Sequence, residues 1–357
     1  MSKNLKFDIL RTTLAIGIAL LIAIVIILFV SKEPLAAIQE LLIGPIGSIR
    51  HFGNVLEMTI PLVFTGLSIS IMFKANQFNV AAEGAFFAGA IGASIIAMKL
   101  ALPIVIHPIV AIMIGGLVGA VITGIPAILK VRWGASELVS SLMLNYIAFY
   151  LGLYVINYFF RDVTAGSMVS MPFLATANLI NIIPGTRIHF GIIIAAAMTV
   201  MAYFYMYKSK RGYEIIVTGE NIKFAEYSGI KTGSVILTAQ LIGGFIAGVG
   251  GATEVLGMYT RFSWQALPGY GWDGVIVAIL ARNNPVLVPV GAFFLAYLRI
   301  GADLMSRNTD VQSDVVAIIQ GIMIVLIVAT SFLAKYKHKL TFNDAKDTLG
   351  ESAKGGK

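Results

Sequence analysis

Ten apolar stretches, separated by basic residues, constrain this chain more than any other feature of its sequence. The first follows Lys3, Lys6 and Arg11 and covers about residues 12–30, close to the roughly 20 residues that one helical membrane crossing needs. The others lie at about residues 54–73, 79–98, 107–129, 136–159, 189–207, 234–255, 268–281, 285–302 and 314–334. The pattern predicts an all-α integral membrane protein of about ten transmembrane helices, one of them short or broken near residues 264–282.

The composition also indicates a membrane protein. Apolar residues make up 58% of the 357 residues and charged residues only 12%, about half the charged share of a soluble domain. The net charge of +8 is distributed between the apolar stretches, so it does not indicate a nucleic-acid-binding face. The chain has no cysteine, its four histidines lie far apart, and it has no Gly-x-x-x-x-Gly-Lys-Ser/Thr loop. We therefore expect no metal site and no nucleotide hydrolysis by the chain itself.

The basic residues predict the orientation. If the N-terminus is cytoplasmic and all ten stretches cross the membrane, 18 of the 26 lysine and arginine residues lie on the cytoplasmic side and 8 on the other side. Cytoplasmic loops of membrane proteins carry such an excess. We expect both termini in the cytoplasm, a single transmembrane domain over residues 1–334, and a polar cytoplasmic tail, disordered, at residues 335–357.

Several polar side chains fall inside the apolar stretches, where they need a partner or a wet cavity. Glu83 lies one turn into the third stretch, and Ser141 and Asn145 share one face of the fifth. Each can line a path for a polar solute or connect two helices, and Glu83 can instead be solvated near the cytoplasmic interface; these interpretations stay open. Glu254, near the outer end of the seventh stretch, is likewise a path residue or an interface charge. Glycines recur in the fourth and seventh stretches, where they predict close helix packing.

Local signals mark the starts of two further helices. Ser136 or Gly134 can cap the fifth, where Glu137 suits the positive helix end. The segment Trp264–Gly274 contains three glycines, a proline and three aromatic residues, which favours a re-entrant or half-length helix over an outer loop with an aromatic belt. The candidate path residues are Asn79, Glu83, Phe86, Ser141, Asn145, Tyr146, Glu254, Trp272 and Asp273.

The inner loop at about residues 208–233 contains a short helix signal. Asn221 can cap a helix over residues 222–228, and Gly229 suits the left-handed position after it. Two isolated helical turns are not stable in water, so this helix must dock on something. The surface it docks on is either a separate cytoplasmic partner or the chain's own helix ends.

Four groups of residues resemble one family of transporters. The inner loop contains Gly212-Tyr213, Gly219-Glu220-Asn221, Ala225-Glu226 and Ser228-Gly229-Ile230, and so resembles the cytoplasmic coupling loop of ABC-importer permeases of the sugar, nucleoside and branched-chain amino acid type. The run Phe78-Asn79-Val80-Ala81-Ala82-Glu83-Gly84 resembles the family's Phe-Asn-x-Gly-x-Glu-Gly motif, with Ala81 where glycine is common. Residues 137–148, and residues 269–274 with Asn283-Asn284-Pro285, resemble the nucleoside (guanosine-type) permeases. The resemblance covers roughly residues 50–335.

The resemblance implies a transport subunit rather than an enzyme. Such a chain forms half of a translocation path for nucleosides, works by alternating access, and passes movement from a separate ATPase through its coupling loop. The implied partners are a paralogous second permease, a cytoplasmic subunit that binds ATP and magnesium, an extracytoplasmic solute-binding lipoprotein and the bilayer of a bacterial plasma membrane. This chain would hold no cofactor. The implied coupling residues are Gly212, Gly219, Glu220, Asn221, Phe224, Ala225, Glu226, Tyr227, Ser228, Gly229 and Ile230.

Other functions compete with this one. The same machine could import a simple sugar such as ribose. An ion-coupled secondary transporter needs an intramembrane acid that titrates, for which Glu83, Glu137 and Glu254 are the candidates. A membrane-embedded enzyme needs a convergent catalytic group, and no histidine lies mid-stretch beside a carboxylate in the sequence. A structural subunit with no path of its own would have no use for a coupling loop.

Overall fold

The computed structural model describes residues 31–312, together with residues 21, 22, 24–29, 314–316, 318, 321, 322 and 325. Within these residues the secondary structure is helical, apart from two isolated β-bridges in the segment between residues 160 and 190. The all-α prediction is therefore confirmed for this part of the chain. Most of the expected stretch at 12–30, most of the stretch at 314–334 and the tail at 335–357 lie outside the described residues. The count of ten spans and the location of the termini thus stay predictions.

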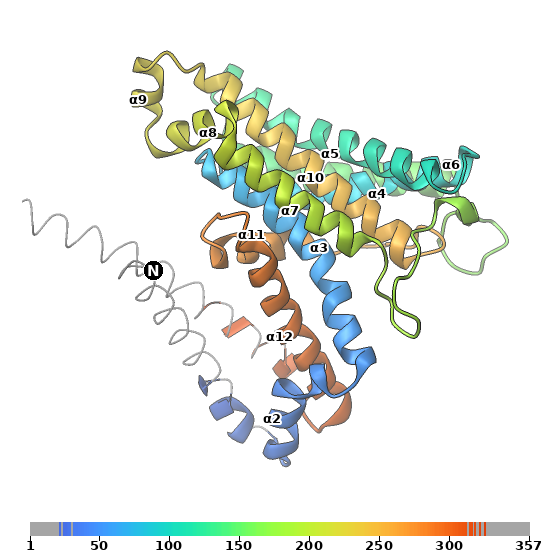
Figure 1. Ribbon diagram of the computed structural model, residues 1–357. Helices are drawn as coiled ribbons and strands as arrows, with labels where there is room; N and C mark the ends of the chain where they lie inside the picture. Colours follow the sequence, from blue (N-terminus) through green and yellow to red (C-terminus); the bar gives the residue numbers. More distant parts are fainter. Residues whose placement is uncertain are drawn as a thin grey trace, which may run out of the picture. The chain divides into compact units, whose positions relative to one another are not determined.

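Seven described helices are long and apolar enough to cross a membrane. They are α3 (Ile49–Lys74), α4 (Ala82–Lys99), α5 (Ile106–Trp133), α6 (Glu137–Phe159), α7 (Gly191–Lys208), α10 (Thr232–Met258) and α12 (Val288–Asn308) (Figure 1). Each matches a predicted stretch to within a few residues. The half-length helix expected near residues 264–282 is α11 (Tyr270–Leu280), which has only 11 residues.

Two described helices were not predicted. Helix α2 (Pro34–Leu42) starts with proline at its first helical position and buries Ala37 and Leu41. Helix α8 (Lys210–Glu220) occupies the first half of the inner loop and precedes the short helix α9 (Ile222–Tyr227). Helices α2 and α8 are too short to be recognised from hydropathy as membrane crossings, and periodicity alone does not identify them. Two 3-10 turns, η1 (Gly44–Ile46) and η2 (Ala175–Ala177), complete the described elements.

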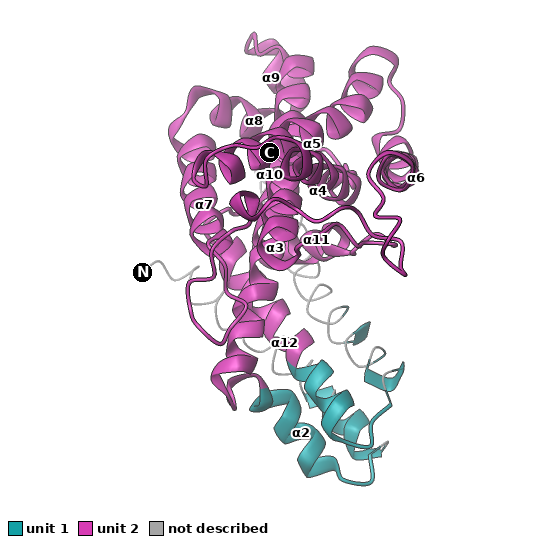
Figure 2. Cartoon of the chain, turned by 90° about the vertical axis from the view of Figure 1, so that its right-hand side faces the viewer, with its two compact units in different colours: residues 1–44, 301–357 teal, residues 45–300 magenta. Residues whose placement is uncertain are grey.

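The chain divides into two compact units, which Figure 2 distinguishes. The larger unit covers residues 45–300 and contains α3 to α11 with most of α12. The smaller unit combines residues 1–44, which include α2, with residues 301–357. In the smaller unit, Asp310 accepts hydrogen bonds from the Ser31 hydroxyl at 2.6 Å and from the Lys32 N–H at 2.7 Å.

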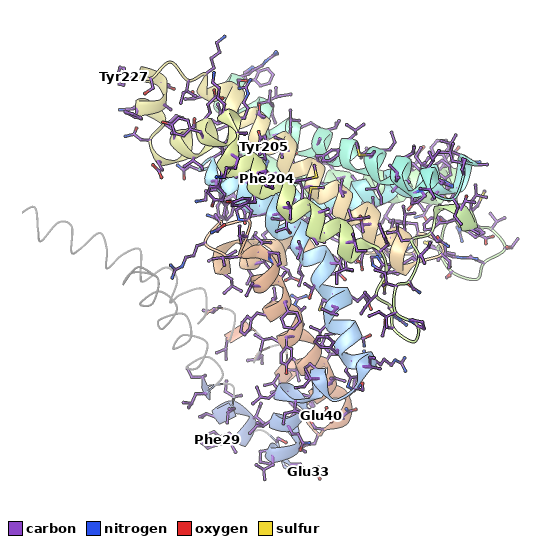
Figure 3. All side chains as sticks on the ribbon, viewed as in Figure 1. Phe29, Glu33, Glu40, Phe204, Tyr205 and Tyr227 are labelled. Carbon is purple, nitrogen blue, oxygen red and sulfur yellow. The ribbon has the colours of Figure 1, made fainter. Side chains whose placement is uncertain are left out.

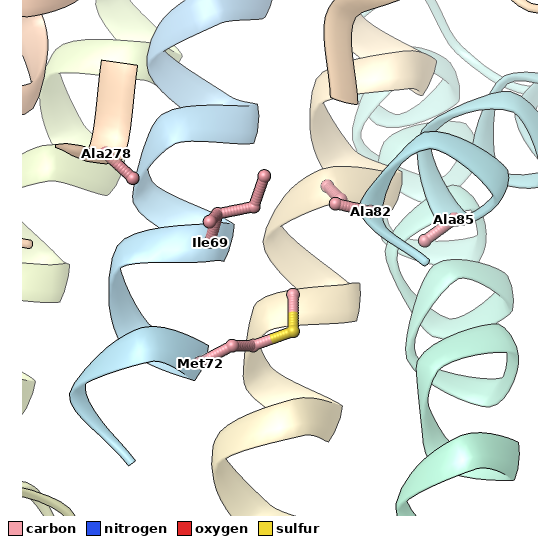
Figure 4. Packing of buried hydrophobic residues seen from close by; sticks show 6 residues of the cluster. Ile69, Met72, Ala82, Ala85 and Ala278 are labelled. Carbon is pink, nitrogen blue, oxygen red and sulfur yellow. The ribbon is translucent and has the colours of Figure 1, made fainter. Parts of the chain in front are cut away.

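Helices α3, α4, α5 and α10 form the core of the larger unit. Glycine lets α5 and α10 approach to backbone contact, because a Cβ on Gly248 would collide with the carbonyl of Gly115. This contact confirms the close packing predicted from the glycines. A cluster of fully buried residues then joins α3, α4, α10 and α11 (Figure 4); it consists of Ile69, Met72, Ala82, Ala85, Ala247 and Ala278. Because four of its six members are alanine, the short helix α11 packs closely against membrane-length neighbours.

Candidate functional site

Asn145 and Ser141, on one face of α6, bind the backbone at the start of α4. The amide oxygen Oδ1 of Asn145 accepts from the N–H of Gly84 at 2.8 Å, and its Nδ2 donates to the carbonyl of Val80 at 3.1 Å. One turn away, Oγ of Ser141 accepts from the N–H of Val80 at 3.2 Å. Both side chains are buried. Because these polar groups are occupied by backbone partners, the geometry favours the helix-connecting interpretation of both residues.

Glu137 extends the same face of α6 by one more turn. Its Oε1 accepts from the N–H of Phe78 at 2.6 Å, across 59 residues of sequence. The predicted cap of α6 is confirmed, since Ser136 Oγ accepts from the N–H of Val139 at 3.5 Å. Glu137 therefore does more than neutralise the end of its own helix: together with Ser141 and Asn145 it positions the loop that leads into α4.

Glu83, in the first turn of α4, caps the half-length helix α11. Its two carboxylate oxygens accept from the N–H groups of Gly269 at 2.7 Å and Gly271 at 2.5 Å. The unpaired N–H groups and the positive end of a helix dipole favour a carboxylate at this place. Gly269 adopts a φ of +85°, and a Cβ on Gly271 would collide with the backbone of Glu83. The N-terminal turns of α4 and α11 are thus in direct contact.

An ion pair fixes the same end of α11 to α12. Arg299 Nη2 donates to Asp273 Oδ1 at 2.5 Å, and the side chain of Asp273 is only 5% exposed. A buried carboxylate paired with arginine in this way is expensive to disrupt, because removing either member leaves the other charge unpaired. The sequence interpretation included Asp273 and missed Arg299; a lone arginine inside an apolar stretch was the available signal.

Asn79 and Phe86 connect the α4 motif to other helices. The Nδ2 of Asn79 donates to the side chain of Gln240 on α10, and Oδ1 of Asn79 accepts from the N–H of Ala81 at 2.7 Å. Phe86 stacks on Trp264 with ring centroids 5.9 Å apart and contacts Tyr270 at 5.4 Å. Gln240 was not predicted, because its pairing with Asn79 spans 161 residues and leaves no local pattern.

The remaining path candidates separate into two groups. Tyr146 and Trp272 lie at the surface of the chain, with 60% and 46% of their area exposed, so they do not join the buried candidates. Glu254 is only 3% exposed, and its Oε2 has no hydrogen-bond partner among the described residues. The structure therefore brings Asn79, Glu83, Ser141 and Asn145 together around the start of α4 and places Glu254 on α10 with a polar atom unsatisfied.

The predicted capped helix in the inner loop is confirmed as α9. Asn221 Oδ1 accepts from the N–H of Phe224 at 3.0 Å, and Gly229 adopts a φ of +78° after the helix. Tyr227, labelled in Figure 3, is 92% exposed. Phe224 is 57% exposed, while Ala225 is buried. The helix thus packs against the rest of the chain through Ala225 and leaves two aromatic side chains exposed. Its C-terminal turn closes with an Ile230 N–H bond to the Ala225 carbonyl at 3.0 Å.

Helix α8 connects α9 to the ends of two long helices. A Cβ on Gly219 would collide with the carbonyl of Lys74, the last residue of α3, and a Cβ on Gly212 would collide with the α7 carbonyls of Tyr205 and Met206. Gly212 and Gly219 therefore allow α8 to pack closely against the ends of α3 and α7. Glu226 accepts a hydrogen bond from the Thr232 hydroxyl at 3.1 Å. Glu220 is the last residue of α8, and Ser228 directly follows α9.

The surroundings of two ionisable groups outside the long helices lower their pKa values. Hydrogen bonds from Thr164 and the charge of Arg261, 3.1 Å away, lower the pKa of Asp162. Burial lowers the pKa of His189 to about 4, and the Nδ1 of its ring accepts from the N–H of Gly191 at 3.1 Å. His189 is therefore neutral at physiological pH. Across the described residues there is no group of three or more histidine, aspartate and glutamate side chains that could hold a metal ion.

Comparison with known proteins identifies a family match over most of the chain. Residues 52–328 match the family described as the permease component of the branched-chain amino acid transport system. A guanosine ABC transporter permease protein of Bacillus subtilis is 32% identical over 82% of this chain and 85% of its own length. A glucose ABC transporter permease protein of Haloferax volcanii is 29% identical over 96% and 91%. A nucleoside ABC transporter permease protein of Lactococcus lactis subsp. cremoris is 27% identical over 92% and 93%.

Proposed function

The chain belongs to the family of branched-chain amino acid transport system permease components, and from this premise we propose that it is the nucleoside-carrying membrane subunit of an ATP-driven importer. It is a multi-pass membrane permease of the nucleoside, sugar and branched-chain amino acid type, and it is not itself catalytic. An ABC permease works with a separate ATPase and a binding protein. Two of the relatives above are described as carrying guanosine or nucleosides, which favours a nucleoside as the solute.

The exposed aromatic face of α9 is the observation that carries the proposal. Phe224 and Tyr227 project from a helix of six residues, which is too short to be stable without a docking surface. Only Ala225 turns inward, so the chain itself leaves the larger side chains uncovered. We infer that the ATP-binding subunit covers them, and that this subunit carries the ATP and magnesium.

Helix α8 supplies the connection from that docking surface to the membrane helices. Gly219 on α8 lies directly against the last residue of α3, and α9 follows α8 in the chain. A displacement of α9 is therefore passed through α8 to the end of α3. Helix α3 in turn packs against α10 and α11. Closure of the ATPase would thus be converted into a switch between inward and outward access.

The rest of the assembly follows from the proposed role. The path is shared with a paralogous second permease, and a solute-binding lipoprotein delivers the solute on the outer side of a bacterial plasma membrane. Five basic residues in the loop at 208–233, namely Lys208, Lys210, Arg211, Lys223 and Lys231, support a cytoplasmic location for α8 and α9. With ten spans, both termini then lie in the cytoplasm, residues 1–334 form the transmembrane domain and residues 335–357 a cytoplasmic tail.

A sugar is the second candidate solute. The glucose permease of Haloferax volcanii is similar over 96% of this chain, so a hexose or a pentose such as ribose is also a candidate solute. Both solute classes require the same ATPase coupling, so α8 and α9 do not distinguish between them.

The test is solute uptake in cells that lack this chain, with and without a plasmid that restores it. Radiolabelled guanosine, uridine, ribose, glucose and leucine would be compared in the presence of a proton-gradient uncoupler, with cellular ATP monitored. We expect nucleoside uptake that depends on the chain and resists the uncoupler while ATP remains. Uptake of a sugar alone would establish the second candidate. Uptake that collapses with the gradient at normal ATP would identify a secondary transporter and overturn the proposal.

A further inference from the structure

Glu254 differs from the other buried carboxylates of the larger unit because it has no hydrogen bond within the described part of the chain. Glu83 binds two backbone N–H groups, whereas Asp273 and Glu137 each have one oxygen bound, to Arg299 and to the Phe78 N–H, and the other oxygen without a partner. Glu254 is 3% exposed, and its Oε2 is buried without a partner among the described residues. Leaving such a group unsatisfied costs kilocalories per mole, so a native protein that keeps one calls for an explanation. A partner that binds only during function is such an explanation.

A second carboxyl group, Glu57, lies on the neighbouring helix α3. Helices α3 and α10 pack in opposite directions, with Gly243 against Met72 and Gly250 against Phe64, so Glu57 comes toward the level of Glu254. Glu57 interacts electrostatically with Glu254, and Arg187 interacts with Glu57. Two tyrosines, Tyr259 and Tyr270, also interact electrostatically with Glu254. Glu254 and Glu57 thus offer carboxyl oxygens from two helices that pack side by side, and Arg187 interacts with Glu57.

Aromatic rings lie beside these carboxyl groups. Tyr270 contacts Phe86 at 5.4 Å between centroids, and Phe86 is stacked on Trp264 with an interplanar angle of 13°. Tyr259 meets the same Trp264 edge-on at 5.9 Å. A row of rings therefore includes Tyr259 and Tyr270, which both interact electrostatically with Glu254. Such rings provide apolar faces against which a flat or weakly polar ring can pack.

Two more unsatisfied polar groups lie at the same level of α10. Oγ1 of Thr253 and Nε2 of His189 are buried without partners among the described residues. The two side chains meet at Gly191, where an added Cβ would lie 2.6 Å from Thr253 and 2.5 Å from the His189 ring. Since Nδ1 of neutral His189 accepts from Gly191, its Nε2 carries the hydrogen. Three polar groups without partners among the described residues, on Thr253, Glu254 and His189, thus lie near one turn of α10.

We propose that Glu254 and Glu57 bind vicinal hydroxyl groups of the transported solute, while the rings of Phe86, Trp264 and Tyr270 pack against its apolar face. The inference deepens the proposed function and rests on it, because it assigns a solute subsite within the same importer. The chemical class is a compound with a sugar ring, which a nucleoside and a free sugar share. A carboxylate that accepts hydrogen bonds from sugar hydroxyls is the arrangement by which dinucleotide-binding proteins recognise ribose.

A cation is the other class of ligand that two carboxyl groups could bind. The charge of Arg187 on Glu57 opposes a cation and leaves a neutral, hydroxyl-rich ligand better matched. With Glu254 only 3% exposed, the subsite is closed in this conformation and would open during alternating access.

The experiment measures competition binding to membrane vesicles that contain this chain and its permease and ATPase partners but not the solute-binding protein. The probes are labelled guanosine with unlabelled guanosine or 2′-deoxyguanosine as competitors, and ribose with 2-deoxyribose as the parallel pair. Omitting the binding protein keeps its own selectivity out of the measurement. Glu254→Gln and Glu57→Gln are compared with Glu33→Gln, an exposed carboxylate in the smaller unit.

For the wild type we expect the hydroxylated competitor to bind at least about tenfold more tightly than its deoxy analogue, because a site built for a hydroxyl rejects a ligand that lacks it. Glu254→Gln and Glu57→Gln are expected to reduce this ratio to about twofold, and Glu33→Gln to leave it unchanged. The ratio is taken within one vesicle preparation, so it does not depend on how much protein is inserted. Glu254→Asp, which keeps a carboxyl group, is expected to retain part of the discrimination.

Three results would overturn the subsite while leaving the importer intact, provided that wild-type cells take up one of the solutes. These are a wild type that binds both competitors equally, a ratio unchanged in both glutamine variants, or, when binding is measured with and without sodium, a sodium dependence in the wild type that Glu254→Gln abolishes while the ratio is preserved. The last result would assign the two carboxyl groups to a cation. Absence of uptake of every nucleoside and sugar by wild-type cells would instead overturn the proposed function.

Discussion

Asn145 on α6 accepts a hydrogen bond from the backbone N–H of Gly84 on α4 at 2.8 Å. Gly84 has no side chain at a place where a Cβ would lie 2.8 Å from the oxygen of Asn145 and 3.0 Å from its Cα. Gly84, the one glycine of the Phe78–Gly84 motif, and the amide of Asn145 on α6 are therefore complementary. They join two segments that are 61 residues apart in the sequence, and the start of α4 depends on both.

Replacing Asn145 with alanine is expected to destabilise the protein. The change leaves the N–H of Gly84 and the carbonyl of Val80 buried without their partner, at a cost of about 1–3 kcal/mol. Thermal unfolding of the detergent-solubilised full chain should show a lower midpoint for Asn145→Ala. Tyr146→Ala, at an exposed neighbouring position, is the matched control and should leave the midpoint unchanged. An unchanged midpoint for Asn145→Ala, combined with lost uptake, would instead place Asn145 on the solute path.

Glu83→Gln is expected to loosen the half-length helix α11. The amide that replaces the carboxylate has one acceptor oxygen for the two N–H groups of Gly269 and Gly271, and it has no charge to interact with the helix dipole. We expect a loss of about 1–3 kcal/mol and faster hydrogen exchange at the first turn of α11. Glu33→Gln, at an exposed position in the smaller unit, serves as the control. Equal exchange in the two variants would show that Glu83 does not hold this turn.

These contacts show which parts of the structure were accessible from the sequence. Membrane-length helices follow from runs of apolar residues, and the cap at Asn221 with its glycine at 229 is a signal contained within nine residues. Helix α8 was not predicted because its apolar face covers only 11 residues.

Pairings between distant residues had no comparable signal. Glu83 lies 188 residues from Gly271, and Asp273 finds Arg299 on another helix. A single sequence shows that a buried carboxylate needs a partner, but only packing decides which residue supplies it. For that reason the sequence left path and helix-connecting roles open for Glu83 and Asn145, and the structure supplies their hydrogen-bond partners.

Phe224→Ala and Tyr227→Ala are expected to separate coupling from folding. Both side chains are exposed, so their removal should change the free energy of unfolding by no more than about 0.5 kcal/mol. If the ATPase covers them, the double variant should lose most of the ATPase that copurifies with the wild type, and uptake should fall in parallel. Val163→Ala, at another exposed apolar position, is the control. Normal copurification by the double variant would remove α9 from the docking surface.

His189 predicts a specific dependence of stability on pH. Burial lowers its pKa to about 4, whereas the unfolded chain titrates near 6.5. The unfolded state therefore binds a proton first as the pH falls, so the stability that neutral His189 contributes is complete above pH 6.5 and is lost progressively toward pH 4. The loss is about 3 kcal/mol at the lower limit. Thermal unfolding of the solubilised protein between pH 7 and 4 should show a shallower decline for His189→Asn, whose side-chain oxygen can still accept from Gly191. Parallel pH profiles for the two proteins would mean that another group causes the decline.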